Sequence, residues 1–151
     1  MSEASTTPDL VELVRSGFES LSRGDVAAIL TLLAPDVVFQ GRAEGVTGRI
    51  DGAAAFCEFW EGWYGTFQEL KIAPEEILDL GNGIVWTVYR QEGRVAGTSG
   101  LVAEQYSIVF EIVDGVAVRL TNYTDIPEAR AAAERLAEER AQADAEGSHD
   151  S

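Results

Sequence analysis

The chain has 151 residues, 46% of them hydrophobic and 25% charged, which is the composition of a single globular domain with its own core. The formal net charge of −15 argues against nucleic acid and anionic membrane surfaces as partners, because binding to such polyanions relies on lysine and arginine. The single cysteine, Cys57, excludes an intramolecular disulfide, and neither a secretory signal nor a membrane-spanning apolar run is found, so we expect a cytoplasmic protein.

Two helices are predicted near the N-terminus. Residues 1–6 are small and polar and are expected to form a disordered tail. Thr7 is the expected N-cap of the first helix, in which apolar residues recur every three or four positions until Gly24. Asp25 is the expected cap of a second, shorter helix, which Pro35 ends.

A strand and a third helix follow. The segment 36–41 (DVVFQG) predicts a short strand, and the glycine-rich segment 41–50 is interpreted as a loop, since it lacks the lysine and the spacing of a phosphate-binding loop. Asp51 is the expected cap of the third helix. The aromatic residues of this helix share one face, which indicates packing into the core or, as the alternative, the wall of a pocket. They are Phe56, Phe59, Trp60 and Trp63.

After residue 66 the period of the apolar residues changes from 3.6 to 2, which predicts a run of strands. Short turns are expected at 81–83 (GNG) and 114–115 (DG), and a longer turn region at 92–100. The strands are expected over 67–80, 83–91, 101–113 and 116–124.

The last predicted element is a helix. Asp125 and Glu128 have the spacing of a capping box at its start. Residues 143–151 are polar and acidic, include the only histidine, His149, and are expected to form a second disordered tail. The order of elements predicts one α+β domain over 7–142, with the helices on one side of a mostly antiparallel sheet.

Three segments carry a resemblance to a known family: GDVAAILTLLAPDVVF (24–39), SGLVAEQYSIVFEIVDG (99–115) and NYTDIPEA (122–129). Over about 9–135 the chain resembles the SnoaL-like polyketide cyclase branch of the nuclear transport factor 2-like superfamily. The resemblance implies a cystatin-like α+β roll, in which three N-terminal helices wrap a cone-shaped, strongly curved, mixed or antiparallel sheet and a C-terminal helix follows. It also implies an apolar cavity and a homodimer formed through the outer face of the sheet.

Strand alternation indicates which side chains face that cavity, because successive side chains point to opposite faces of a sheet. The more apolar face of 104–111 includes Glu104 and Tyr106, and the same reasoning over 116–124 puts Val116 and Val118 inside. Together with the aromatic helix and the resemblance, these faces define the predicted ligand-binding set. Its members are Phe39, Phe59, Trp60, Trp63, Thr87, Tyr89, Gln91, Ile108, Leu120, Asn122 and Thr124.

The opposite face of the sheet is expected to be the dimer surface. The resemblance places Trp86 and Val88 on this outer face, where they would supply exposed apolar area. Tyr123 has the same parity and is interpreted as a packing residue, while the capping spacing explains Asp125 fully.

Glu104 and Tyr106 are the predicted catalytic pair. A carboxyl group on an apolar wall loses hydration, which disfavours its charged form and would let Glu104 take or give a proton near neutral pH. Tyr106 or Tyr89 would then donate a hydrogen bond to a developing oxyanion. As the alternative, Glu104 pairs with an arginine or with hydroxyl groups and only shapes the cavity. Arg42 and Arg49 are interpreted as solvated loop residues rather than as attractors of an acidic substrate.

Two enzymatic branches of the superfamily demand residues that this chain lacks. The resemblance aligns the carboxylate base of the ketosteroid isomerase-like branch with Gln40 or Gly41, and the aspartate–arginine–aspartate set of the limonene epoxide hydrolase-like branch with Tyr89, Gln91 and Asn122. Two function classes stay open: a cofactor-free isomerase, cyclase or dehydratase acting on a small hydrophobic molecule, and a non-catalytic ligand-binding or dimeric interaction protein. Neither class calls for a cofactor, and no acidic cluster has the spacing of a metal-ligand set.

Overall fold

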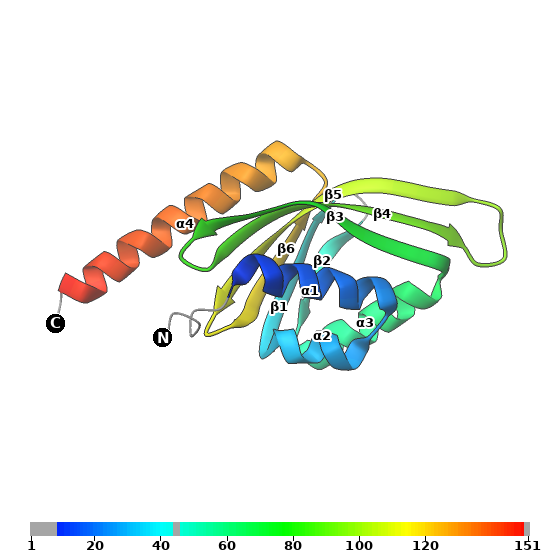
Figure 1. Ribbon diagram of the computed structural model, residues 1–151, viewed down its shortest axis with the longest axis horizontal. Helices are drawn as coiled ribbons and strands as arrows, with labels where there is room; N and C mark the ends of the chain where they lie inside the picture. Colours follow the sequence, from blue (N-terminus) through cyan, green and yellow to red (C-terminus); the bar gives the residue numbers. More distant parts are fainter. Residues whose placement is uncertain (1–8, 44–45, 150–151) are drawn as a thin grey trace, which may run out of the picture.

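The computed structural model describes residues 9–43 and 46–149 of the chain as an α+β domain (Figure 1). This part of the chain forms four helices and six strands, and none of these helices combines the length and the hydrophobicity that a membrane span requires. In chain order the elements are α1 (Leu10–Arg23), α2 (Val26–Leu32), β1 (Leu33–Ala43), β2 (Val46–Asp51), α3 (Ala53–Gly65), β3 (Phe67–Gly81), β4 (Ile84–Val95), β5 (Leu101–Val113), β6 (Val116–Tyr123) and α4 (Ile126–His149).

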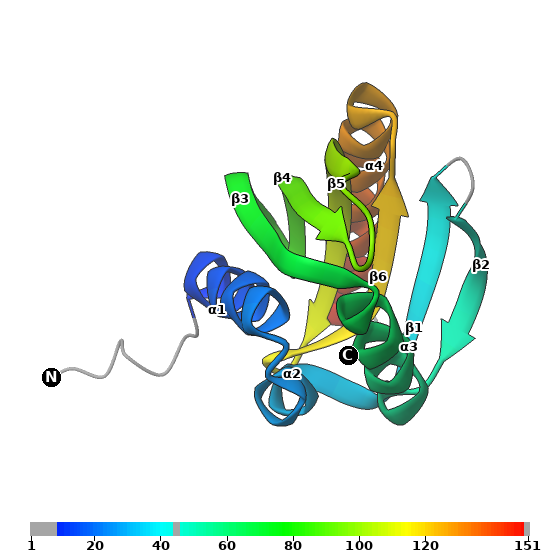
Figure 2. The same ribbon diagram turned by 90° about the vertical axis from the view of Figure 1, so that its right-hand side faces the viewer.

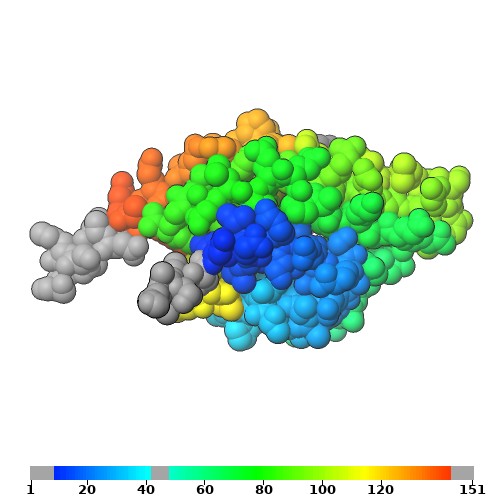
Figure 3. All heavy atoms as spheres, viewed as in Figure 1, coloured from blue at the N-terminus to red at the C-terminus, as the bar shows by residue number. Residues whose placement is uncertain are grey.

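All six strands belong to one sheet with the order β2-β1-β6-β5-β4-β3. β1 and β6 are parallel, and every other neighbouring pair is antiparallel. The sheet curves strongly around α1, α2 and α3, which lie on its concave side (Figure 2). On that side α1 lies directly against β3 (Figure 3). The expected α+β roll with three wrapping helices is confirmed.

Short polar side chains start the first two helices. The carboxylate of Asp9 accepts hydrogen bonds from the backbone N–H groups of Val11 and Glu12, so Asp9 is the N-cap of α1. The expected cap, Thr7, lies outside the described residues. Asp25 caps α2 as predicted, since its side chain accepts a hydrogen bond from the N–H of Ala28.

The segment that was expected to be a glycine-rich loop contains a strand. β2 pairs antiparallel with β1, with Gly48 opposite Gly41, and the two glycines weaken the apolar alternation that identifies a strand. Asp51 is the last residue of β2 and forms an ion pair with Arg49 at 2.9 Å, so it does not cap α3. Gly52 holds the cap position with φ +99°, and no side chain completes the cap.

The closing helix lies on the other face of the sheet from α1–α3, which corrects the expectation that all helices share one side (Figure 1). Ala129, Ala133 and Ala137 are buried against the outer face. There α4 covers Trp86 and Val88, the two residues that were expected to be exposed for a dimer. The helix also continues to His149, past the end expected at residue 142.

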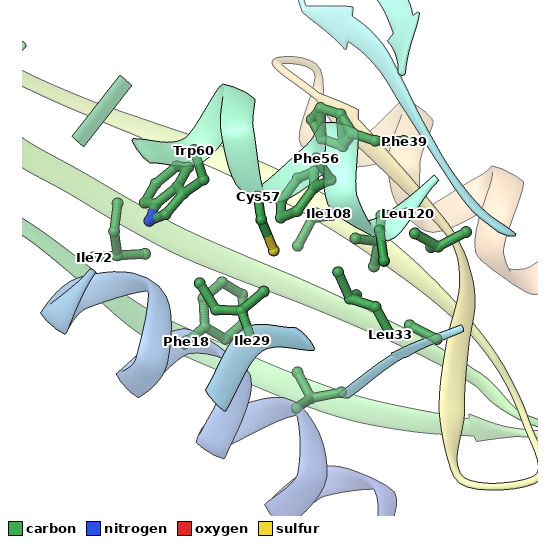
Figure 4. Close-up of a cluster of buried hydrophobic side chains, with 14 of the residues drawn as sticks. Phe18, Ile29, Leu33, Phe39, Phe56, Cys57, Trp60, Ile72, Ile108 and Leu120 are labelled. Atoms are coloured by element: carbon green, nitrogen blue, oxygen red, sulfur yellow. The ribbon is translucent and has the colours of Figure 1, made fainter. Parts of the chain in front are cut away.

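The main hydrophobic core fills the concave side of the sheet. Side chains from α1, α3 and β5, including Phe18, Phe56 and Ile108, point toward one another, and each is more than nine-tenths buried (Figure 4). Complete burial of a side chain of this size stabilises the fold by about 2 kcal/mol. The indole N–H of Trp60 donates a hydrogen bond to the carbonyl oxygen of Leu21 at 3.2 Å, which fixes α3 to α1.

Candidate functional site

A cavity of about 270 Å³ lies between α3 and the concave face of the sheet. Among the described residues its wall contains no charged side chain; aromatic rings form most of it, and two amides supply polar groups. α3, β1, β4, β5 and β6 all contribute to the wall. The lining residues are Phe39, Phe59, Trp60, Trp63, Tyr89, Gln91, Tyr106 and Asn122. All eight belong to the residues predicted from the sequence as ligand-binding or catalytic.

The aromatic face of α3 contributes both to the hydrophobic core and to the wall of the cavity, the two alternatives that its spacing indicated. Phe56 and Trp60 are buried in the core, whereas Phe59 is 37% exposed and Trp63 is half-buried. Trp60 reaches the core and the cavity together, because it lies between the two. The helix therefore connects the core to the cavity wall, and a change in its packing will reach the site.

Three hydrogen bonds fix the polar groups of the site. The hydroxyl of Tyr89 donates to Oδ1 of Asn122 at 2.7 Å, and the indole N–H of Trp63 donates to Oε1 of Gln91 at 3.2 Å. The hydroxyl of Tyr106 donates to Oε2 of Glu104 at 2.8 Å. The pairing of β4 with β5 explains this proximity, because Tyr89 lies opposite Tyr106 and Gln91 lies opposite Glu104.

Glu104 is exposed to solvent, which corrects the expectation that an apolar wall removes its hydration. Strand alternation does put it on the concave face beside Gln91. It lies near the start of β5, however, three residues from the exposed Leu101, where the β4–β5 hairpin projects past the helices (Figure 1). Glu104 therefore stands at the edge of the cavity and reaches it through the hydroxyl of Tyr106.

The two tyrosines of the site remain neutral phenols far above neutral pH. Burial, followed by the hydrogen bond and the charge of Glu104, raises the pKa of Tyr106 to about 12. Burial is also the main cause that raises the pKa of Tyr89, with a further contribution from Tyr106, while the hydrogen bond to Asn122 lowers it. Both hydroxyls are therefore hydrogen-bond donors under physiological conditions.

Four residues of the predicted ligand-binding set lie outside this cavity. Ile108 and Leu120 line a smaller apolar cavity of about 60 Å³ deeper between the sheet, α1 and α2. Thr87 is completely buried and its hydroxyl donates to the carbonyl oxygen of Ile108 at 2.8 Å. Thr124 follows the end of β6 and is exposed.

Phe18 of α1 supports the site and is absent from the residues predicted for it. Its ring centroid lies 5.3 Å from that of Tyr89, so it supports the cavity wall from behind. Its place in the apolar pattern of α1 gives no separate signal of this contact.

The remaining polar candidates have local structural partners. Asp125 accepts a hydrogen bond from the N–H of Glu128 at 3.0 Å, in agreement with its predicted capping role. Arg49 pairs with Asp51 in β2, and the side chain of Arg42 lies outside what the structure describes. Within the described residues, no group of three histidine, cysteine, aspartate or glutamate side chains is arranged to hold a metal ion.

The fold agrees with the comparisons to known proteins. A profile of the SnoaL-like domain family matches residues 14–120, which is more than half of the chain, so the protein belongs to this family. No curated protein sequence matches it.

Solved structures show the same fold. An NTF2-like protein of unknown function from Burkholderia pseudomallei is 21% identical, with a TM-score of 0.68 over 81% of this chain and 95% of that one. TerC, co-crystallized with polyporic acid, is 19% identical, with a TM-score of 0.66 over 82% and 97%. A candidate polyketide cyclase from Xanthomonas campestris is 25% identical, with a TM-score of 0.62 over 78% and 90%.

Proposed function

We propose that this protein binds a small, mostly apolar molecule in the aromatic cavity. The observation that carries the proposal is the cavity wall itself, in which six aromatic side chains and two amides surround about 270 Å³. An apolar concavity with a few placed polar groups is the usual form of a small-molecule site. The co-crystallization of TerC, which has the same fold, with polyporic acid supports the proposal.

The polar edge of the cavity supports acid–base chemistry without a cofactor. A proton removed from a bound ketone would pass to the oxygen of Tyr106, whose own proton moves to the carboxylate of Glu104. Where the bound molecule is a β,γ-unsaturated ketone, the electron pair left behind forms a dienolate, and return of the proton at the γ-carbon moves the double bond and completes an isomerisation. No atom is gained or lost in these steps. Glu104 and Tyr106 thus act as one relay from the cavity to its edge.

Binding without chemistry is the second candidate function. It is favoured by the exposure of Glu104 and by the presence of Gln40 and Gly41 where a related branch carries its base. In that case the relay only orients a ligand, and the cavity serves to sequester it.

Hydrogen exchange at the carbon beside a carbonyl separates these functions. The protein is incubated in D₂O with small cyclic enones and ketones, and deuterium incorporation is followed by NMR while binding is measured by calorimetry. If Glu104 is the terminal proton acceptor, Glu104→Gln and Tyr106→Phe each slow exchange by about 10²- to 10⁴-fold with little loss of binding.

Glu75→Gln is the matched control, because Glu75 is an exposed carboxylate that bonds Gln105 and does not line the cavity. Exchange that is as fast in Glu104→Gln as in the unchanged protein excludes Glu104 as the acceptor. Binding without exchange in the unchanged protein selects the non-catalytic function. If no apolar compound binds at all, the proposal is wrong.

A further inference from the structure

The cavity contains two amide groups whose hydrogen-bond donors are unused. The side chains of Gln91 and Asn122 are only 5% and 7% exposed. Among the described residues, each amide oxygen accepts a hydrogen bond and neither amide nitrogen donates one. An amide N–H needs an acceptor from a bound molecule or from water, so these two nitrogens indicate which ligand groups the cavity favours.

The orientation of Gln91 follows from its partner. An indole N–H can only donate, so Trp63 requires an acceptor and the amide oxygen of Gln91 must face it. The NH₂ group of Gln91 is therefore turned to the other side, and Gln91 lines the cavity.

Asn122 is hydrogen-bonded to Tyr89. The neutral hydroxyl of Tyr89 donates to the amide oxygen of Asn122, which leaves the NH₂ group as the free end. Within the described part of the chain, Trp86 Nε1 is the one side-chain polar atom that is both fully buried and unpartnered. The amide nitrogens of Gln91 and Asn122 are therefore still accessible to a molecule in the cavity.

The register of the sheet separates the backbones of Gln91 and Asn122, so the two amides enter the cavity from different positions on its wall. Asn122 pairs with Ile108, and Ile108 pairs with Thr87. Gln91 lies four residues further along β4 than Thr87, which is roughly 13 Å along the strand, and two strand spacings add roughly 10 Å across the sheet. Tyr89 lies between the two amides, so an aromatic surface joins the two donors.

From this arrangement we infer that the ligand is uncharged and has a hydrogen-bond acceptor oxygen, such as a ketone, at each end of a flat apolar body. The inference rests on the proposed binding function and names its ligand class. Two NH₂ donors disfavour an ammonium ion, since neither offers it an acceptor. An anion is disfavoured because no lysine or arginine of the described residues lines the cavity, Glu104 stands at its edge, and the chain carries a net charge of −15.

Three probes with one carbon skeleton test this inference by calorimetry: 2,6-diacetylnaphthalene, 2-acetyl-6-ethylnaphthalene and 2,6-diethylnaphthalene. One hydrogen bond contributes about 3- to 10-fold in affinity, so the diketone is expected to bind most tightly and the hydrocarbon most weakly. Gln91→Met and Asn122→Leu remove one donor each while keeping the approximate size of the side chain. In either variant the diketone loses its advantage over the monoketone, whereas the affinity for the hydrocarbon is retained.

The outcomes separate this inference from the proposed function. If the hydrocarbon binds the unchanged protein as tightly as the diketone, the two-ended ligand is wrong although the binding function stands. Tighter binding of 2-naphthoate or of a naphthyl trimethylammonium ion than of the diketone overturns the uncharged ligand. If none of the probes binds, the binding function itself fails. Should a variant not fold, the ranking of the three probes on the unchanged protein still decides.

Discussion

Tyr106 is the side chain that joins the cavity to the carboxylate of Glu104 at its edge. Its ring packs 5.6 Å from that of Tyr89, and its hydroxyl bonds Glu104. Because the phenol is held between an apolar wall and a negative charge, loss of its proton is doubly opposed. Because this arrangement keeps the Tyr106 hydroxyl protonated, the pKa of Tyr106 reports whether the hydrogen bond to Glu104 and the burial of the ring are intact.

Ionisation of Tyr106 is expected to reduce stability at alkaline pH. In the unfolded chain a tyrosine loses its proton near the ordinary pKa of 10.0, whereas the folded protein keeps that proton until the pKa of about 12. The unfolded state thus binds fewer protons in this interval, and the free energy of unfolding falls as pH rises from about 10 to 12. Urea unfolding at several pH values measures the slope, which should be smaller in Tyr106→Phe.

The Glu104→Gln variant tests how much the carboxylate contributes to the raised pKa of Tyr106. Without the carboxylate the pKa of Tyr106 should fall below 12 but stay above 10.0, because burial is the largest cause of the shift and is unchanged. NMR of ring-labelled tyrosine reports the value directly. No change in the pKa of Tyr106 would mean that the bond to Glu104 does not form in solution.

At the residue scale, the period of a strand predicts which face of the sheet a side chain points to better than it predicts how deeply that side chain is buried. Alternation places Tyr106, Gln91 and Asn122 on the concave face, because side-chain period is a local property of a strand. It does not reveal that Glu104 lies beyond the helices, since the extent of cover depends on elements distant in sequence. Likewise a register shift after Glu111 places Ala117 in the core cluster in place of the expected Val116.

At the scale of elements, the β3–β4 turn depends on two glycines with different surroundings. Gly81 has φ +92° and open space around it, while Gly83 has φ +82° and lies against the carbonyl oxygen of Ile112. Left-handed backbone disfavours any other residue at both positions, but a side chain at Gly83 would also collide with the backbone of β5.

Gly83→Ala should therefore destabilise the protein more than Gly81→Ala. We expect a loss of about 1 kcal/mol at Gly81 from backbone strain alone, and about 3 kcal/mol at Gly83 from strain and overpacking together. The two midpoints of urea unfolding give the comparison. Equal losses would show that the chain around Ile112 moves aside without cost.

Element types were predictable where the local pattern is strong and failed where it is weak. The strand β5 has the bounds that its alternation predicts, Leu101–Val113. The pattern of β2 does not identify a strand, because Gly48 interrupts the alternation between Val46 and Ile50 in a segment of only six residues. The side of the sheet that α4 occupies had no local signal, because a helix whose buried stripe is alanine has little amphipathic contrast.

At the scale of the whole molecule, α4 already covers the outer face of the sheet. Ala133 is completely buried on this face, and the guanidinium of Arg130 lies 4.9 Å from the ring centroid of Trp86. The family match ends at residue 120, so α4 lies outside it. A homodimer through the face that includes Trp86 and Val88 would have to displace α4, because α4 and a second copy of the chain would cover the same surface.

We expect the full chain to remain monomeric at micromolar concentration and Ala133→Arg to associate, because an arginine at this buried position prevents α4 from seating and uncovers Trp86. Light scattering measures the mass of each. Ala131→Arg is the matched control, since it adds the same charge to the exposed side of the same helix and should stay monomeric. If the unchanged chain forms a dimer and the fluorescence of Trp86 is still that of a buried indole, the interface lies elsewhere. If the dimer instead exposes α4 to proteolysis, a second copy of the chain has displaced α4 from the outer face of the sheet.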